Sequence, residues 1–533
     1  MNSKIFLILL LISCQLFADW AQETLNKLSL EEKIAQLFII KVNNSDFTNN
    51  KNDTIQDQII NSPEKMRRQE TIRLIKKYKI GGVHLVCYGT ISSCYNTIKK
   101  FQRLSKLPLL ISQDFEWGLG MRLTDAISFP KNMTLGAIQN NNLIYDKAKE
   151  IGRQCKLLGV HINFGPVVDI NTNHLNPVIN DRSFGDDKEN VTQKALQVMS
   201  GLQDENIIAC AKHFPGHGDT ALDSHKYLPI INHDLARLKS IELYPFKQLI
   251  NKGVKAIMSA HIDVPAIDAR PNRSITFSKK GITDLLQTQL GFKGLIITDD
   301  LDMKAITNFF KPEEIALEAF KAGNDILLMS KDIETAIKSL KDAIEKKIIS
   351  ETELNRRVLK ILKTKQDLGL DKNRFAPNYS YKNFFTPQAK KLKETLFESS
   401  ITIARDLNHL IPVQKCKRTT YIELNKTTTK EYIANLNKQV KGEQNIIISL
   451  FDLNKSDHTN YGLTTHILEF LNNLAKTKKN IILIIYGTPY SLKLFKNYKT
   501  IIVAYEDHKY AQNAVDKILT GKLKAIGKLP IKI

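Results

Sequence analysis

The sequence predicts an α/β protein in which a (β/α)8 barrel is followed by a smaller α/β domain. Short, nearly uninterrupted apolar segments, as expected for strands buried on both faces, alternate with stretches of helical periodicity. Polar residues that can do chemistry come directly after several of these segments. Further apolar segments of the same kind follow residues 371–392, a polar stretch that contains two prolines.

Eight apolar segments supply the expected barrel strands within residues 19–370. Residues 142–158 and 234–252, which lie between them, carry apolar residues at helical spacing. Strands that alternate with helices run parallel. Eight such units fit a closed barrel better than the alternative, an open doubly wound sheet. The expected strands are 34–40, 80–86, 107–112, 160–168, 207–211, 256–260, 294–298 and 325–329.

A linker and a second domain complete the expected organisation. Residues 371–392 are polar and aromatic, contain two prolines and lack a clean period, so they predict a linker that crosses the barrel surface. Residues 393–533 again alternate strand-like and helix-like segments. The expected strands there are 420–424, 446–450, 481–486 and 501–504, and the expected helices are 465–476 and 510–520.

Length and composition fit a large globular protein. The chain has 533 residues, which is enough for about two to four domains. Apolar and charged shares of 42% and 25% are ordinary for a folded chain and exclude intrinsic disorder, a collagen-like fibre and a polytopic membrane protein. Six cysteines in so long a chain exclude a disulfide scaffold. The net charge of +22 favours anionic surroundings and raises nucleic acid as the first partner to consider.

Residues 1–18 have the layout of an export leader. Lys4 precedes an apolar stretch at 5–12 that is too short to span a bilayer. Residues 11–14 resemble a lipobox, in which Cys14 becomes the lipidated first residue; cleavage after Ala18 is the alternative. An uncleaved anchor would also account for this stretch. We expect an exported protein, located in the periplasm, in the cell envelope or outside the cell, with membrane attachment if Cys14 is lipidated.

The densest group of chemically competent residues is the loop at 212–225, after the fifth expected strand. It contains three histidines and two aspartates, and its glycines and proline predict a turn. A plain polar loop is one interpretation. A metal site is another, although the spacing fits no common zinc pattern. The third is acid–base catalysis, because Asp223 and His225 are two apart in a stretch expected to be extended and so share a side. The candidate metal ligands are His213, His217, His225 and Asp223.

A second group of carboxylates follows the seventh expected strand. A carboxylate at such a strand end can attack a sugar as a covalent nucleophile. Asp299 and Asp300 are adjacent, and alternation along a strand predicts that only one of them points into the site. The pattern does not choose between them. Asp300 or Asp302 could instead cap the next helix.

Two further loops combine charges with aromatic residues. Residues 114–122 contain Asp114, and residues 176–185 contain Arg182. A carboxylate that accepts hydrogen bonds from vicinal hydroxyls, beside an arginine that donates to others, is a workable way to hold a sugar.

These motifs together resemble the β-N-acetylhexosaminidase branch of glycoside hydrolase family 3. The resemblance lies in the loop at 212–225 and in residues 163–171, 180–187, 257–268 and 291–306, which occur in the family's order. The second domain, with its ending at 527–533, is similar to the family's α/β sandwich domain.

The resemblance implies retaining, two-step hydrolysis of terminal N-acetylglucosamine (GlcNAc) with no cofactor and no metal. Asp299 then matches the nucleophile, His225 the general acid/base and Asp223 its partner. The residues that match the sugar-holding positions are Asp114, Arg182, Lys212 and His213.

The resulting hypothesis is an exported exo-β-N-acetylglucosaminidase that acts on peptidoglycan fragments or other GlcNAc-containing glycans. Three alternatives are a GlcNAc phosphorylase, a β-glucosidase of the same family and a non-catalytic glycan-binding lipoprotein. No nucleic-acid-binding motif is present, so the +22 charge is better explained by an anionic cell envelope or an acidic glycan.

Overall fold

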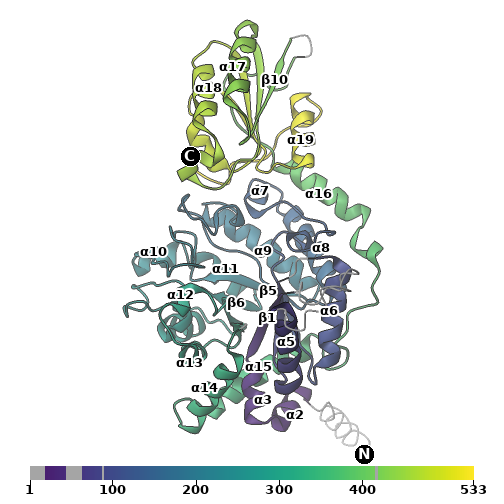
Figure 1. Cartoon of the computed structure of the whole chain (residues 1–533), viewed down its shortest axis with the longest axis vertical. Helices are drawn as coiled ribbons and strands as arrows, with labels where there is room; N and C mark the ends of the chain where they lie inside the picture. The colour runs from purple at the N-terminus through teal and green to yellow at the C-terminus, as the bar shows by residue number, and fades with distance from the viewer. Residues whose placement is uncertain (1–18, 44–62, 87–88, 330, 415–417, 533) are drawn as a thin grey trace, which may run out of the picture.

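The computed structural model describes residues 19–43, 63–86, 89–329, 331–414 and 418–532. They form a large barrel body and a smaller α/β body, with helix α16 (Pro387–Ser400) leading from one to the other (Figure 1). The expected leader, with Cys14, lies outside the described residues. Within the described part of the chain, no helix combines the length and the apolar character needed to cross a bilayer.

The large body is a parallel barrel, as predicted. Its strands follow one another around the sheet from β1 to β7, and β8 pairs with β1. A parallel bridge between Ile297 and Ile326 joins the two remaining edges and closes the barrel, which rules out the open sheet. The strands are β1 (Phe38–Asn43), β2 (Gly82–Val86), β3 (Leu110–Gln113), β4 (Ile162–Asn163), β5 (Ile208–Phe214), β6 (Ala256–Ser259), β7 (Leu295–Thr298) and β8 (Leu327–Met329).

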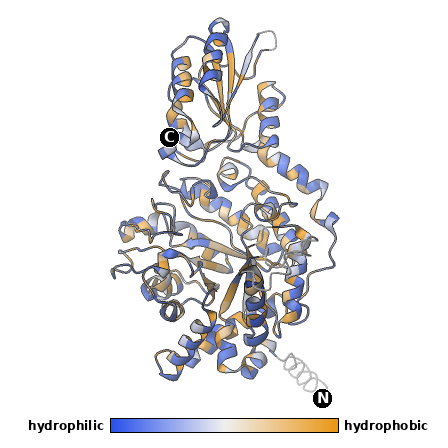
Figure 2. Ribbon diagram, in the orientation of Figure 1, coloured by the Kyte–Doolittle hydropathy of each residue, from blue (hydrophilic) through white to orange (hydrophobic). Residues whose placement is uncertain are grey.

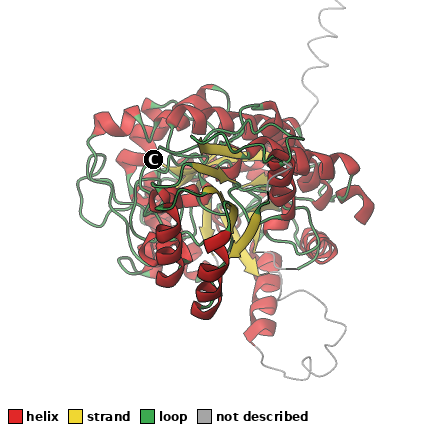
Figure 3. Ribbon diagram, turned by 90° about the horizontal axis from the view of Figure 1, so that it is seen from above, coloured by secondary structure: helices red, strands yellow, loops and turns green. Residues whose placement is uncertain are grey.

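Helices surround these strands, as the view from above shows (Figure 3), and they turn apolar faces inward (Figure 2). The α-helices are α2 (Trp20–Lys27), α3 (Leu30–Ala35), α5 (Pro63–Tyr78), α6 (Ile91–Leu104), α7 (Asn132–Gly136), α8 (Asn142–Leu158), α9 (Lys188–Asp204), α10 (Leu235–Ser240), α11 (Tyr244–Asn251), α12 (Lys304–Thr307), α13 (Pro312–Ala322), α14 (Ile333–Glu345) and α15 (Glu351–Asp367). The barrel body also contains a π-helix, η5 (Lys280–Gln289), and the short 3-10 turns η2 (Leu119–Met121), η3 (Asn180–Arg182), η4 (Ile275–Phe277) and η6 (Tyr381–Phe384).

Two predicted elements of the barrel are wrong in detail. The expected strand at 34–40 begins as helix α3, because Ser29 and Glu32 form a capping box that starts a helix. The expected helix at 234–252 is two helices, α10 and α11. Pro245 lies in the first turn of α11, where its missing N–H costs nothing, but it would break a continuous helix.

The expected strand at 160–168 is also much shorter than predicted. Strand β4 ends at Asn163, and Pro166, which has no N–H to donate, follows two residues after Phe164. Beyond β4 the chain stays beside β5 through backbone hydrogen bonds, including those from Cys210 N–H to Gly165 O and from Val168 N–H to Lys212 O, both at 2.8 Å. The apolar run therefore continues as buried irregular chain that lines the site.

The smaller body is an α/β sandwich. Its parallel strands are β10 (Thr420–Leu424), β11 (Asn445–Leu450), β12 (Asn480–Ile485) and β13 (Thr500–Val503), close to the four predicted ranges, and β9 (Thr402–Asp406) pairs antiparallel with β13. Strand β9 was not predicted, because four of its five residues are only partly buried and it carries no apolar run.

Buried apolar residues cover both faces of this sheet. One core joins it to α17 (Lys430–Gln439) and α18 (Thr465–Ala475), and the other joins it to α16 and α19 (Lys509–Leu519). The remaining helical turns are η7 (Val440–Gly442), η8 (Asp457–Gly462) and η9 (Pro489–Phe495). Helices α18 and α19 match the predicted ranges within one residue.

Residues of the expected linker lie against helices of the barrel, and a helix begins before the expected end of the linker. Tyr95 Oη donates to the carbonyl of Pro377 at 3.0 Å, and Arg153 donates to that of Asn383 at 2.9 Å. Helix α16 begins at Pro387, inside the expected linker, because Thr386 caps it and Pro387 suits its first turn.

The small body docks on the loops that follow β3 and β4. The N–H of Lys528 donates to Ala137 O at 2.9 Å, and the N–H of Asp186 donates to Pro530 O at 3.1 Å. Asn171 donates to Tyr490 Oη at 2.7 Å. Because Arg182 lies between the docked segments of the barrel, the small body helps to fix the loop that carries it.

Candidate active site

A cavity of about 370 Å³ lies at the carboxyl ends of the barrel strands. This is the face on which residues of successive strands of such a barrel converge. Six of the seven predicted site residues line it, and Asp223 lies beside it in contact with His225. The six are Asp114, Arg182, Lys212, His213, His225 and Asp299.

A buried ion network forms one wall of the cavity. Lys212 Nζ lies 2.8 Å from Asp114 Oδ1 and 2.9 Å from Glu116 Oε1, and Arg182 Nη2 lies 2.7 Å from Glu116 Oε1. Arg122 Nη2 lies 3.1 Å from Asp114 Oδ2. Alternating charges at these distances place acceptors and donors at fixed positions for a polyhydroxylated ligand.

The network keeps its members ionised. Burial works to raise the pKa of Glu116, but Arg182 and Lys212 outweigh it and bring that pKa to about 2. Burial likewise opposes the charged form of Lys212, yet Asp114 and Glu116 raise its pKa overall. The pKa of Asp114 stays well below its usual value because Lys212, His84 and Arg122 outweigh its burial.

His213 is held in one orientation by a fully buried carboxylate. Its Nδ1 lies 2.7 Å from Asp169 Oδ2, and its Nε2 lies 3.4 Å from Arg182 Nη2. Since a guanidinium only donates, the Nε2 atom accepts and the Nδ1 atom carries the proton donated to Asp169. Asp169 therefore orients the ring of His213 and fixes its tautomer.

His217 lines the cavity, and both of its ring nitrogens form hydrogen bonds within the loop. Its Nδ1 lies 2.8 Å from Thr220 Oγ1, and its Nε2 lies 3.0 Å from Ser224 Oγ. Burial, followed by the nearby His213, lowers the pKa of His217 to about 4, so its ring is neutral near pH 7. These hydrogen bonds tie the middle of the loop to Ser224, next to His225.

The metal interpretation of the loop does not fit this geometry. Both ring nitrogens of His217 and the Nδ1 atom of His213 are engaged by side chains of the barrel and loop. Within the part of the chain that the structure describes, clustered metal-ligand side chains occur at Asp219, His233 and Glu242, and these do not line the cavity.

Asp223 and His225 contact each other, as predicted, but for a different reason. The chain turns here, with the N–H of Lys226 donating to Asp223 O at 2.9 Å, whereas the sequence predicted an extended stretch. Asp223 Oδ1 accepts from His225 Nδ1 at 2.8 Å and from the His225 N–H at 2.9 Å. Burial works to raise the pKa of Asp223, but these two hydrogen bonds lower it.

His225 presents its ring to solvent at the mouth of the cavity. Its side chain is 65% exposed, while that of Asp223 is 29% exposed. With Nδ1 held by Asp223, the Nε2 atom is the one that can exchange a proton with a bound molecule.

Both aspartates after β7 reach the cavity, which corrects the prediction that only one would. Strand β7 ends at Thr298, so the alternation of a strand does not extend to Asp299 and Asp300. Asp300 uses one oxygen for Lys41, at 2.5 Å, and the other for the N–H of Asp302, at 3.0 Å. Asp300 is therefore engaged in holding the turn.

Asp299 remains ionised and less engaged. Its Oδ1 atom accepts from the N–H of Asp300 at 2.8 Å, and its own N–H donates to Ser259 O. Burial works to raise the pKa of Asp299, but His261, His213 and the Asp300 N–H lower it overall. An ionised carboxylate beside a cavity is what nucleophilic attack on a sugar requires.

Sequence reasoning missed Glu116, Lys41 and His84, all of which line the cavity. Glu116 lies in the loop at 114–122, two residues after Asp114, but nothing in the local sequence indicates that two cations converge on it. Lys41 is a charged residue near the end of β1, so its position at a strand end was the available signal.

The barrel that carries this cavity is similar to known proteins. Residues 29–364 match the family described as "Glycosyl hydrolase family 3 N terminal domain". The chain is 36% identical over 330 residues to "Beta-hexosaminidase A" of Pseudoalteromonas piscicida, covering 56% of this chain and 55% of that protein. It is 35% identical over 266 residues to a "Beta-hexosaminidase" of Nitrosomonas eutropha, covering 48% of this chain and 75% of that one. The match to the first relative thus spans about half of that relative's length.

A solved structure matches almost the whole chain. It is a glycoside hydrolase family 3 β-N-acetylglucosaminidase from Paenibacillus sp., with a TM-score of 0.79 and 27% sequence identity. The match covers 95% of this chain and 99% of that one, so it includes both bodies and their order along the chain.

Proposed function

The chain belongs to glycosyl hydrolase family 3, and we propose that it is a retaining exo-β-N-acetylglucosaminidase. The observation that carries this proposal is the pairing of one ionised carboxylate, Asp299, with an Asp223–His225 dyad at the same cavity. Together they supply the two groups that a two-step glycosidase needs.

In the first step, Asp299 attacks the anomeric carbon of the terminal sugar while His225 protonates the leaving oxygen. The C–O bond to the leaving group breaks as the bond to the Asp299 carboxylate forms. Asp223 accepts a hydrogen bond from Nδ1 of His225 and stabilises the ring when it is protonated.

In the second step, His225 takes a proton from water, which attacks the anomeric carbon and releases Asp299. Two inversions leave the configuration of the sugar retained. The exposure of His225 suits this step, because water reaches the ring from the open side of the loop.

The ion network is proposed to hold the sugar itself. Asp114 accepts from sugar hydroxyls, and Arg182 and Lys212 donate to others, each already oriented by a neighbouring charge. His213 adds an imidazole that Asp169 keeps in one tautomer. Because these side chains are already oriented, binding the sugar has a smaller entropic cost.

We further propose that the enzyme is exported and acts on peptidoglycan fragments or another GlcNAc-bearing glycan. The supports are the leader-like residues 1–18 and the positive charge of the chain, which suits an anionic envelope. Lipidation of Cys14 is proposed as the means of membrane attachment, and that residue lies outside the described structure.

The test is hydrolysis of nitrophenyl glycosides that differ only at the 2-position of the sugar, with muropeptide assayed alongside. Turnover of the 2-acetamido substrate, lost in Asp299→Ala, supports the proposal. Preference for the glucoside would favour a β-glucosidase. GlcNAc-1-phosphate formed in phosphate buffer would favour a phosphorylase, and binding without turnover would favour a lectin-like lipoprotein.

A further inference from the structure

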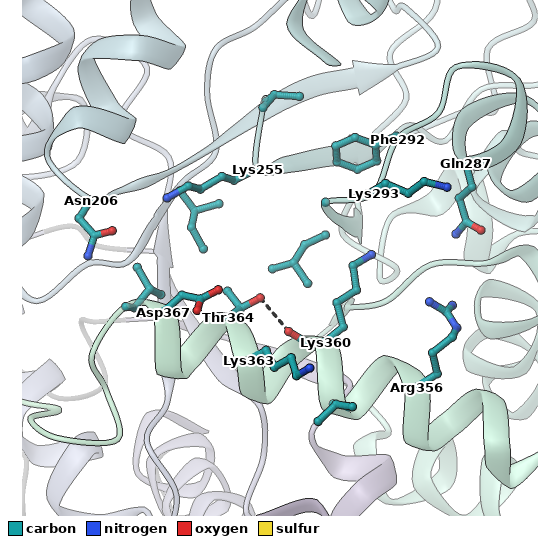
Figure 4. Close-up of a pocket in the computed structure, with 16 residues that line it drawn as sticks. Asn206, Lys255, Gln287, Phe292, Lys293, Arg356, Lys360, Lys363, Thr364 and Asp367 are labelled. Atoms are coloured by element: carbon teal, nitrogen blue, oxygen red, sulfur yellow. Dashed lines mark hydrogen bonds between the residues drawn. The ribbon is translucent and has the colours of Figure 1, made fainter. Parts of the chain in front are cut away.

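A second cavity, of about 610 Å³, lies at the amino-terminal end of the barrel strands. Residues just before β5, β6 and β7 form one side of it, and one face of helix α15 forms the other (Figure 4). It shares no lining residue with the active-site cavity. Its volume lies in the range of small-molecule sites.

Five cationic side chains line this cavity, against one carboxylate, Asp367. Lys255 directly precedes strand β6, and Lys293 lies two residues before strand β7. The other three lie on α15 at intervals of four and three residues, which place them on one face of the helix. Those three are Arg356, Lys360 and Lys363. Figure 4 shows Arg356 and Lys360 extending from α15 toward the strand ends that carry Lys255 and Lys293.

Two of the five charges are neutralised by the protein. Arg356 Nη2 lies 2.8 Å from Glu353 Oε1, and Lys360 Nζ lies 2.6 Å from Asp325 Oδ2. The other three lysines, Lys255, Lys293 and Lys363, form no ion pair with any residue that the structure describes.

Placing these lysines around one cavity costs electrostatic free energy in the folded protein when no ligand is bound. The three unpaired lysines are exposed and line one concave surface, so their like charges repel one another. Beneath them, Val254, Phe292 and Leu295 are buried and form an apolar floor. Apolar walls of low dielectric strengthen the field that lysines create inside a cavity.

We propose that this basic cavity binds a ligand that carries several phosphate groups. A phosphate brings close to two negative charges and several acceptor oxygens, so a ligand with several phosphates suits lysine ammonium groups spread around one cavity. Lys255, Lys293 and Lys363 make the contacts, and Lys360 contributes while keeping its bond to Asp325. The proposal depends on the barrel geometry and is independent of the glycosidase activity.

The experiment is calorimetric titration of the full chain with inorganic tripolyphosphate at low and at physiological salt. We expect one saturable site. The triple variant K255Q/K293Q/K363Q should weaken binding by about 10-fold or more, whereas K426Q/K441Q/K476Q should change it less than about 2-fold. The second variant removes the same charge from exposed positions of the small domain.

Two results would overturn the proposal. One is the absence of saturable binding by the wild-type chain at physiological salt. The other is an equal loss in both triple variants, which would mean diffuse attraction by the whole +22 chain. Unchanged hydrolysis of an aryl GlcNAc by the variant K255Q/K293Q/K363Q shows that this variant folds. The same assay distinguishes a failure of the phosphate-binding proposal from a failure of the proposed glycosidase function.

A second experiment shows whether the phosphate ligand is a lipid headgroup or a soluble molecule. Sedimentation with vesicles of phosphatidylglycerol and phosphatidylcholine is compared for the same two triple variants. Vesicle binding that is lost only in the cavity variant, and that tripolyphosphate displaces, assigns the site to lipid headgroups. Tripolyphosphate binding without vesicle binding assigns it to a soluble phosphate ligand.

Discussion

The Nδ1 atom of His225 lies 2.8 Å from Oδ1 of Asp223, on a loop that leaves the histidine ring open to solvent. The dyad is therefore anchored at one nitrogen and available at the other. The hydrogen bonds of His217 to Thr220 and Ser224 hold the chain immediately before it. Hydrogen bonds therefore fix the part of the loop around His217, while the ring of His225 stays exposed.

Removing the carboxylate of the dyad should impair proton transfer. We expect Asp223→Asn to lower kcat by about 10²-fold or more, because His225 loses the acceptor that orients it. Thermal melting should stay close to wild type, since the pair is partly exposed. Glycosides with a better leaving group need less protonation, so the loss in their first step should be smaller; an equal loss for all leaving groups would contradict the acid role.

The two aspartates after β7 should respond differently to substitution. Asp299→Asn should reduce kcat by about 10⁴-fold, as expected when the covalent step is lost. Asp300→Asn keeps a hydrogen-bonding amide at the turn and loses only the pair with Lys41, so a smaller loss is expected. Steady-state kinetics with nitrophenyl GlcNAc compares them, and the reverse order would show that Asp300 is the nucleophile.

The buried ion pairs of Glu116 with Arg182 and Lys212 should make the free energy of unfolding depend on pH in the acidic range. The pKa of Glu116 falls from 4.5 to about 2 on folding, so its ionised form contributes about 3 kcal/mol above pH 4.5. That contribution is lost as the pH falls toward 2. Glu116→Gln should destabilise the barrel at pH 7, because Arg182 and Lys212 lose their shared partner, and should flatten the decline below pH 4.5.

Calorimetric melting between pH 2 and pH 7 measures this difference. A variant whose Tm declines as steeply as that of the wild type over the acidic range would show that Glu116 is not responsible.

His217 should add a second pH dependence at higher pH. Its pKa falls from 6.5 to about 4 on folding, so the unfolded chain binds a proton in this window while the folded chain does not. Stability is therefore expected to rise as the pH rises from about 4 to 6.5. In His217→Asn, melting curves over this window should show a shallower rise, and an unchanged slope would argue against a buried neutral ring.

The docking of the two bodies should be sensitive to Gly185. A Cβ atom there would lie 2.0 Å from Pro530 O, and the residue has a φ of +133°. We expect Gly185→Ala to cost about 2–4 kcal/mol and to expose the C-terminal tail to proteolysis. Gly442→Ala in the small domain, where no atom lies within 4 Å of the added carbon, is the matched control.

Much of the fold was predictable because the barrel and sandwich strands are short apolar segments. The boundaries that were missed depend on caps and prolines, as at Ser29 and Pro245, and on an edge strand, β9, that has no apolar run. Six of the seven predicted site residues line one cavity because they follow strand ends that meet on one face of the barrel. Glu116 was missed because two cations reach it from distant parts of the chain, Arg182 and Lys212.

The most direct test of the proposed mechanism is to trap the glycosyl-enzyme with a slow fluorinated GlcNAc substrate and sequence the labelled peptide by mass spectrometry. We expect one sugar attached to Asp299, and we expect more of this adduct to accumulate in His225→Ala because water is no longer activated. Attachment at Asp300, or turnover with inverted configuration and no adduct, would contradict it.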